Sequence, residues 1–193
     1  MIVTQFTRGL APARAIAQCA EITTSLGLDY WLVEGLSMVD AFNRCVQISD
    51  EAQDDVLILP DDIMAESYHY LAARNCDGIG YAPCKLRTGQ PNTAYRSDGS
   101  TLYTGCVFLF LPRHVRERLE PTVFKTGEHI INRDTGELEY KRPSAAGKHA
   151  DVHFWLTFNE LDPRPSVTEL PPVKHLIHDL SNSYTNFSKI REV

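Results

Sequence analysis

Two adjacent carboxylates, Asp61 and Asp62, come almost directly after a short apolar run at residues 56–59. A run this short and rich in Val, Leu and Ile is typical of a buried strand in a parallel sheet. Ligands bind such sheets in the crevice at the carboxyl ends of the strands. Two acids at that edge repel each other unless a cation or a hydrogen-bonding ligand lies between them. Their oxygens suit Mg²⁺ or Mn²⁺, which usually arrive with phosphates; a solvated loop or a helix cap is the alternative interpretation.

Strand and helix signals alternate in the segments that must position these acids. We expect strands at residues 2–6, 29–34, 55–59 and 78–84, with helices between them. Pro12 suits the first turn of one helix, Gly27 its end, and Ser37 the N-cap of the next. This order predicts right-handed crossovers and a mainly parallel sheet whose strands end at one edge. Three further polar residues should then lie beside the two aspartates: Thr7, Arg8 and Glu34.

The second half of the chain is less regular. A polar, turn-rich stretch at residues 85–100 precedes an expected buried strand at 105–111 and a basic helix at 112–118. Residues 130–131 and 138–140 flank the turn sequence Arg133-Asp134-Thr135-Gly136 and predict a small β-hairpin. A helix is expected at 151–161, with Phe154, Trp155 and Phe158 facing inward, followed by a proline-rich connection at 162–172.

The composition of the chain limits which classes of protein it can belong to. A chain of 193 residues is most economically one domain, residues 1–193. The net charge of −6 argues against nucleic acid as a partner, and no apolar run is long enough for an integral membrane protein. Five cysteines without a Cys-x-x-Cys pair are expected to be reduced and mostly buried, in a cytoplasmic protein. A zinc site or a catalytic thiol is the alternative for these cysteines.

The order and spacing of several motifs resemble a small glycosyltransferase of the GT-A fold, in the family-two-like group. In the first half, Leu32–Ser37 resembles the family's second strand, whose acid and serine face the nucleotide base, and Leu59-Pro60-Asp61-Asp62 falls on its metal-binding "DxD" position. In the second half, Tyr103–Arg113 resembles its glycine-containing acceptor loop and the strand that follows. The other matching segments are Phe42-Asn43-Arg44, Asp151-Val152-His153-Phe154 and His175–Ser181. The resemblance implies a Rossmann-like, mainly parallel central sheet flanked by helices, with a small β-hairpin region. Residues 1–100 would bind the nucleotide sugar and residues 101–193 the acceptor.

The same resemblance assigns roles to individual residues. It implies that Asp61, Asp62 and a C-terminal histidine hold Mn²⁺ or Mg²⁺; His178 is our first choice and His175 its competitor. Asp151 matches the catalytic base, and as an aspartate at a helix start it also suits an N-cap. The nucleotide sugar would contact Thr7, Arg8, Glu34, Arg44 and Asp61. Two departures from the family pattern are Pro60 in place of the first acid and Ala150-Asp151 in place of paired acids.

Arginines and aromatic residues have two interpretations each. The guanidinium groups of Arg8 and Arg44 match phosphate geometry, although isolated arginines are more often partners in surface salt bridges. Tyr95, Tyr103 and Trp155 are candidates for stacking on sugars, although aromatic residues at this spacing are usually part of a core.

These features predict a metal-dependent transferase that moves a sugar from a nucleotide-diphosphate sugar to a hydroxyl acceptor, with inversion favoured. The acceptor is a glycan, a protein or a small molecule. One alternative is a metal-dependent nucleotidyl or phosphoryl transferase, although the sequence has no Gly-x-x-x-x-Gly-Lys loop. The other is a non-catalytic nucleotide-sugar-binding module, for which Pro60 is the supporting feature.

Overall fold

The computed structural model describes residues 1–7, 13–85, 91–125, 128–131, 138–141, 150–177 and 191–192. A six-stranded sheet forms its centre, in the order β11-β5-β8-β3-β1-β2. β1 is parallel to β2 and β3, β11 is parallel to β5, and only β8 runs antiparallel to its neighbours β3 and β5. The strands are β1 (Ile2–Thr7), β2 (Asp29–Glu34), β3 (Val56–Pro60), β5 (Ile79–Tyr81), β8 (Leu109–Leu111) and β11 (Val167–Glu169). The predicted mainly parallel, Rossmann-like sheet is confirmed.

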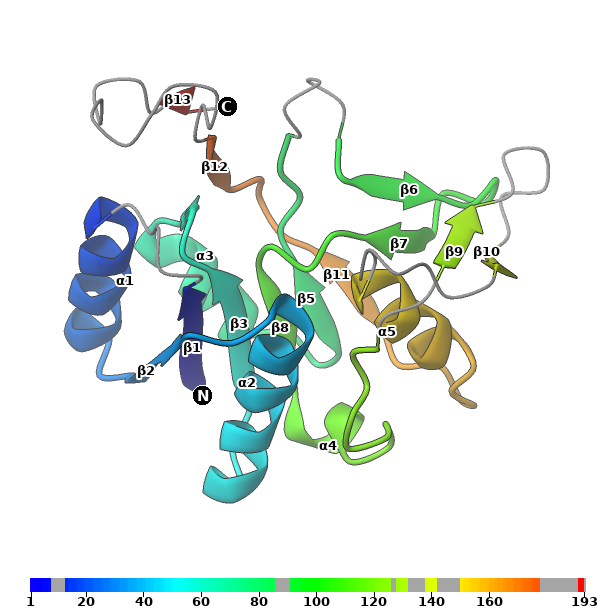
Figure 1. The fold of residues 1–193 in the computed structure, drawn as a ribbon, viewed down its shortest axis with the longest axis horizontal. Helices are drawn as coiled ribbons and strands as arrows, with labels where there is room; N and C mark the ends of the chain where they lie inside the picture. The colour runs from blue at the N-terminus through cyan, green and yellow to red at the C-terminus, as the bar shows by residue number, and fades with distance from the viewer. Residues whose placement is uncertain are drawn as a thin grey trace.

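Helices cover both faces of the sheet (Figure 1). Alternate residues of β3 explain this, because Val56 and Ile58 pack in one apolar cluster while Leu57 and Leu59 pack in another. The first cluster includes α2 and α5, and the second includes α1 and α3. The helices are α1 (Ala13–Ser25), α2 (Met38–Ala52), α3 (Ser67–Arg74), α4 (Arg113–Arg116) and α5 (Ala150–Asn159). Among the described residues, no helix combines the length and the apolar character needed to cross a membrane.

Local signals at helix ends act as the sequence predicts. Ser37 is the N-cap of α2, and its Oγ accepts a hydrogen bond from the Asp40 backbone N–H at 3.2 Å. Gly27 follows the end of α1 with φ +62°, a left-handed conformation that costs glycine little. Phe42, Cys45 and Val46 form the buried face of α2, as their spacing predicts.

Three smaller sheets surround the central one. The predicted hairpin consists of β9 (Glu128–Ile131) and β10 (Leu138–Lys141), which pair antiparallel. A second antiparallel pair consists of β6 (Thr93–Tyr95) and β7 (Thr101–Thr104). β6 lies in the stretch that was predicted only as turn-rich, and β7 follows that stretch directly. The third sheet consists of β4 (Ile63–Met64), β12 (Lys174–Ile177) and β13 (Arg191–Glu192), in the order β13-β12-β4.

Two strand predictions need correction. The strand expected at residues 105–111 contains only β8, because Gly105 to Phe108 form a loop whose backbone bonds elsewhere, with Gly105 N–H donating to Asn92 O at 3.0 Å. The proline-rich stretch, expected as a connection, contains β11. Pro165 lies before β11 and Pro171 and Pro172 after it, so they leave its pairing with β5 intact.

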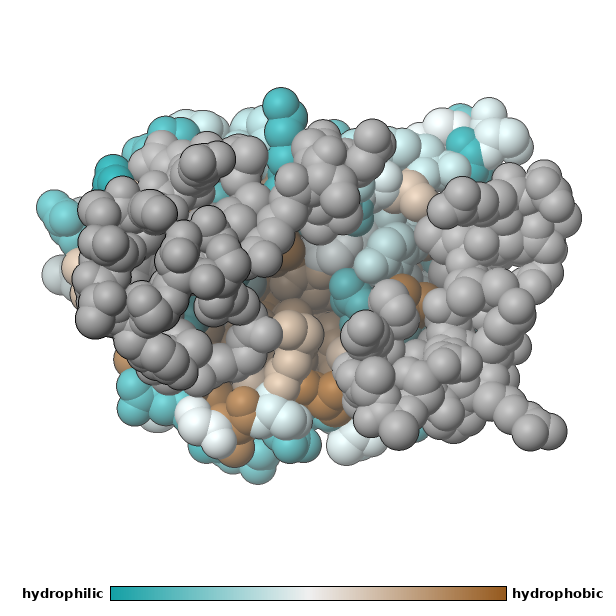
Figure 2. Space-filling model, turned by 45° about the horizontal axis from the view of Figure 1, so that its top comes forward, coloured by the Kyte–Doolittle hydropathy of each residue, from teal (hydrophilic) through white to brown (hydrophobic). Residues whose placement is uncertain are grey.

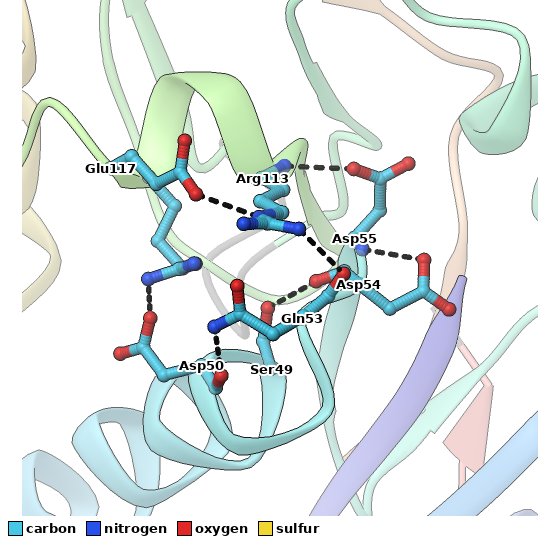
Figure 3. A network of polar contacts seen from close by, with 8 residues as sticks. Ser49, Asp50, Gln53, Asp54, Asp55, Arg113 and Glu117 are labelled. Atoms are coloured by element: carbon cyan, nitrogen blue, oxygen red, sulfur yellow. Dashed lines mark hydrogen bonds and ion pairs between the residues drawn. The ribbon is translucent and has the colours of Figure 1, made fainter.

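A polar network lies at the amino-terminal end of β3 (Figure 3). The Asp55 carboxylate accepts a hydrogen bond from the Arg113 backbone N–H at 2.7 Å, which joins β3 to the start of α4. The Arg113 guanidinium bonds Glu117 at 2.6 Å, and Arg116 pairs with Asp50 of α2. Each of these acids has a partner within the fold, so the network has a structural role. The candidate functional acids are those at the carboxyl ends of the parallel strands.

Candidate active site

The carboxyl ends of the parallel strands bring together the polar residues that the sequence predicted to meet. In the strand register Thr7 pairs with Glu34, and Phe6 pairs with both Val33 and Pro60. The Asp61 backbone N–H continues this ladder by donating to Phe6 O at 3.0 Å. Thr7, Glu34 and Asp61 therefore lie at the same level of the sheet edge. Figure 2 looks toward this side of the molecule, where the surface is hollowed near its centre and both apolar and hydrophilic residues contribute to the hollow.

The Asp61 carboxylate is the unusual group at this edge. Asp61 is only 6% exposed, and its side chain forms no hydrogen bond or ion pair with any described residue. Burying a carboxylate without a partner is costly, so native structures pair such groups with donors, cations or ligands. This position is therefore suited to a bound group that brings positive charge or hydroxyl donors.

Buried side chains fix the backbone on which Asp61 stands. Gln5 is fully buried in β1, and its Nε2 donates to Pro60 O at 3.4 Å while its Oε1 accepts from the Tyr30 hydroxyl at 2.8 Å. β3 ends at Pro60, and Asp61 and Asp62 form the turn that leads into β4. The two aspartates thus lie in a turn and are not successive residues of an extended strand.

Asp62 is held by the C-terminal strand β12. The Leu176 backbone N–H donates to Asp62 O at 2.7 Å, and His175 is paired with Ile63 of β4. This pairing places His175 Nε2 3.0 Å from Asp62 Oδ2, with both side chains mostly buried. The hydrogen bond to Asp62, with a further contribution from Cys84, raises the pKa of His175 to about 10 even though burial opposes this change.

One of the two candidate histidines lies among the described residues. His175 contacts Asp62 directly, whereas His178, our first choice as a metal ligand, lies outside the described residues. Arg8 also lies outside them. The hydrogen bond makes His175 a neighbour of Asp62, and the role of His178 stays a prediction.

Arg44 is not brought to this edge. Its Nη1 lies 2.8 Å from Glu51 Oε1, two turns further along α2, and both side chains are substantially exposed. α2 begins near the carboxyl end of β2 and ends near the start of β3, so Glu51 draws Arg44 toward the opposite edge. The surface ion pair, which was the alternative interpretation, describes this arginine in the structure.

A second carboxylate, Asp151, stands in the first turn of α5. It accepts a hydrogen bond from the Tyr103 hydroxyl at 3.2 Å, and α5 begins at Ala150, so Asp151 lies within the helix and is not its N-cap. Burial and the charge of Asp151 raise the pKa of Tyr103, which keeps its hydroxyl protonated as a donor. Gly105 lies against this carboxylate, because a Cβ there would be 3.7 Å from Asp151 Oδ2. The glycine-containing loop and the acid are therefore neighbours, as the sequence motifs suggested.

Asn92 joins the two parts of the site, and sequence reasoning did not identify it. Its Oδ1 accepts from the Cys84 backbone N–H at 2.9 Å, and its Nδ2 donates to Gly105 O at 3.3 Å. Cys84 is one of the groups that raise the pKa of His175, and Gly105 lies close to the Asp151 carboxylate. A buried asparagine thus connects the Asp62–His175 pair to the surroundings of Asp151. In the sequence it belonged to a run of turn residues and gave no separate signal.

Replacing Asn92 with alanine should destabilise the protein by about 1–3 kcal/mol, because the buried Cys84 N–H would lose its partner. The Gly105 carbonyl would still accept a hydrogen bond from the Val107 N–H at 2.8 Å. The free energy of unfolding, measured in urea, tests this expectation. Ser97→Ala in the neighbouring exposed turn is the control and should change stability by less than about 0.5 kcal/mol. Equal stability of the two variants would show that Asn92 does not hold the site together.

Sugar stacking by Trp155 is excluded by its position. Trp155, Phe154 and Phe158 are each 0% exposed and pack on one another, so they belong to the core as their helical spacing predicted. Tyr103 is engaged with Asp151. Tyr95 is 47% exposed and remains available to a ligand.

The donor set near Asp62 fits a divalent cation that is shared with a ligand. A carboxylate oxygen and an imidazole nitrogen lie side by side there, one residue after Asp61, whose carboxylate has no partner among the described residues. Because the raised pKa keeps His175 protonated, a cation would have to displace this proton before the nitrogen could coordinate it. Among the residues that the structure describes, no group of three or more His, Cys, Asp or Glu is arranged to hold a metal by itself. Mg²⁺ commonly takes only one or two carboxylates from the protein and completes its shell with phosphates and water, so this arrangement is compatible with such a cation.

No protein-family profile matches the sequence, and no curated protein matches it significantly. The fold is similar to that of A197 from STIV, with a TM-score of 0.58 and 15% identity over 92% of this chain and 87% of that one. Weaker likenesses are to a glycosyltransferase involved in glycosylation of the major capsid of PBCV-1 (TM-score 0.39, 11% identity, 61% of this chain and 63% of that one) and to a structure named for a nucleotide-diphospho-sugar transferase from Desulfovibrio desulfuricans G20 (TM-score 0.40, 13% identity, 88% and 58%). The first likeness supports the fold alone, and the other two are too weak to carry an argument.

Proposed function

We propose that this protein is a metal-dependent glycosyltransferase of the GT-A kind, which moves a sugar from a nucleotide-diphosphate sugar to a hydroxyl acceptor with inversion. The observation that carries the proposal is the buried Asp61 carboxylate, which has no partner among the described residues, one position before the Asp62–His175 pair at the carboxyl ends of parallel strands. The sequence motifs that resemble the family fall on the same residues.

The donor would bind across the ends of β1, β2 and β3. Glu34 is exposed at the end of β2 and can accept hydrogen bonds from a nucleotide base or ribose. Asp61 would accept hydrogen bonds from ribose hydroxyls or contact the cation. Asp62 and His175 would hold Mn²⁺ or Mg²⁺, which supplies positive charge where the diphosphate leaves.

The acceptor would bind beside Asp151, next to the loop that contains Gly105. In the transfer, the Asp151 carboxylate takes the proton from the acceptor hydroxyl, and the hydroxyl oxygen forms a bond to the anomeric carbon. The bond from that carbon to the diphosphate oxygen breaks, and the nucleoside diphosphate leaves with the electron pair. Glycine at position 105 lets this loop pack closely on its neighbours, because a Cβ there would lie only 3.1 Å from Asn92 Nδ2.

Thermal unfolding in the presence of nucleotides tests the proposal, because a ligand that binds only the folded state raises the melting temperature. UDP and GDP should each be measured with Mn²⁺, with Mg²⁺ and with EDTA, and ATP and GTP should be measured under the same conditions. We expect a rise with a nucleoside diphosphate that requires the cation.

The other outcomes assign the site differently. An equal response to triphosphates alone would favour a nucleotidyl or phosphoryl transferase. A cation-dependent response without release of nucleoside diphosphate from any sugar nucleotide would favour a binding module. No response to any nucleotide would contradict the proposal.

A further inference from the structure

A separate cavity of about 350 Å³ lies between the β6–β7 hairpin, β11 and the segment that precedes β11. Its lining includes Tyr95, Ser100, Thr101, Arg164 and Glu169. β11 is the edge strand furthest from β2 in the central sheet, so this cavity is distinct from the donor site at the ends of β1, β2 and β3.

Glu169 presents a fixed acceptor to this cavity. Its Oε2 accepts hydrogen bonds from the hydroxyls of Tyr81 and Tyr95, both at 2.7 Å. Tyr81 is fixed in turn by Thr101 Oγ1 at 3.0 Å. No described residue donates to the other oxygen, Oε1, although the carboxylate as a whole is oriented by two phenols. Oε1 is therefore available to accept a hydrogen bond from a ligand.

Arg164 presents fixed donors to the same cavity. Its Nη2 donates to Thr101 O at 3.0 Å, and the carbon of its guanidinium lies 5.5 Å from the centre of the Phe158 ring. Arg96 Nη1 donates to the same carbonyl oxygen at 3.1 Å. A guanidinium has five N–H donors, so both arginines retain donors after these bonds.

The combination of groups suits a polyhydroxylated ligand. A cation would be repelled by Arg164 and Arg96, and a phosphate dianion, although attracted by them, has no hydrogen to donate to Glu169. A sugar unit has hydroxyls that donate to the carboxylate and accept from the guanidinium, and its apolar face can lie on the exposed ring of Tyr95.

The position of the cavity relative to Asp151 suggests which sugar unit it would hold. Arg164 lies over Phe158, which is seven residues from Asp151 along α5, a separation of about 10 Å at the rise of a helix. This exceeds the length of one hexose ring. A sugar in the cavity would thus be a unit beyond the one whose hydroxyl reaches Asp151.

We propose that the Tyr95–Arg164–Glu169 cavity is a subsite for a distal sugar of the acceptor, and that the acceptor is an oligosaccharide of at least two units. The inference rests on the proposed function, and it narrows the acceptor class from any hydroxyl compound to a glycan. The cavity supplies recognition only, and transfer takes place at Asp151.

Direct binding of sugars without donor tests this inference. Saturation-transfer NMR and titration should be carried out with maltose, cellobiose, lactose, chitobiose and an α-mannobiose, using the wild-type protein, Glu169→Gln and Tyr95→Ala. We expect at least one disaccharide to bind, and each variant to weaken that binding tenfold or more. Glu160→Gln, an exposed acid just after α5, is the matched control and should bind as the wild type does.

The outcomes separate this inference from the proposed function. Both variants should keep the cation-dependent response to nucleoside diphosphates, which also shows that they are folded. If that response persists and no disaccharide binds, or if binding is insensitive to both variants, the cavity is not a sugar subsite and only this inference is lost. If sugars bind in a Glu169- and Tyr95-dependent manner but no nucleotide binds, the subsite stands and the transferase proposal fails.

Discussion

Replacing Asp62 with alanine is expected to abolish the cation-dependent rise in melting temperature that a nucleoside diphosphate produces in the wild-type protein. A ligand at one hundred times its dissociation constant stabilises a folded protein by about 2.7 kcal/mol. For a chain of this length that corresponds to roughly 5–10 °C. Asp62 is the carboxylate beside His175, so its loss removes the oxygen ligand from the pair proposed to hold the cation.

Asp29→Ala is the matched control for this experiment. Asp29 is an exposed aspartate at the amino-terminal end of β2, the opposite edge of the same sheet. It should leave the ligand response unchanged. Since Asp62→Ala also takes a partner from His175, the melting temperature of the variant without ligand must be measured first, and the comparison made from that value. A full cation-dependent response in a folded Asp62→Ala protein would remove Asp62 from the metal site.

His175→Gln provides an independent test of the same pair. Glutamine keeps a polar side chain near Asp62 but lacks the imidazole nitrogen, so a role in cation binding predicts a weaker response to Mn²⁺ with the nucleotide. If only the unliganded stability changes, His175 orients Asp62 and is not itself a ligand.

Much of the central sheet could be predicted because its signals are local. The Val56–Pro60 strand is apolar on both faces and lies between two helices, and Ser37 and Gly27 mark helix ends by their own chemistry. β11 has no comparable signal. Three residues between prolines become a strand only because β5 offers a partner, and that partner lies 88 positions away in the chain. Strands defined by such distant pairing are not visible in a local pattern.

The residues of the candidate site also differ in how far the sequence could predict their positions. Thr7, Glu34 and Asp61 were placed together by a rule of topology, because parallel strands bring their carboxyl ends to one edge. Arg44 was placed by its position in a motif, and its ion pair with Glu51 could not be deduced from that position. The contact between Asp62 and His175 depends on the pairing of β12 with β4, which no spacing in the sequence specifies.

Replacing Asp151 with asparagine should leave donor binding intact and reduce turnover by roughly 10²–10⁴-fold, the usual contribution of a positioned general base. Asparagine has nearly the same shape and can still accept the hydrogen bond from the Tyr103 hydroxyl, but it cannot take a proton from the acceptor. The measurement is the release of nucleoside diphosphate from UDP- and GDP-sugars in the presence of the oligosaccharide that binds best, together with the nucleotide-induced rise in melting temperature.

Tyr103→Phe is the informative companion to this variant. It removes the hydroxyl that bonds Asp151 Oδ2 at 3.2 Å and keeps the ring, so it should lower turnover far less than Asp151→Asn does. Because that hydroxyl stabilises the ionised carboxylate, its removal should also raise the pH at which turnover begins to fall on the acid side. Undiminished turnover in Asp151→Asn would show that another group accepts the proton. Loss of donor binding in the same variant would instead place Asp151 in the nucleotide site.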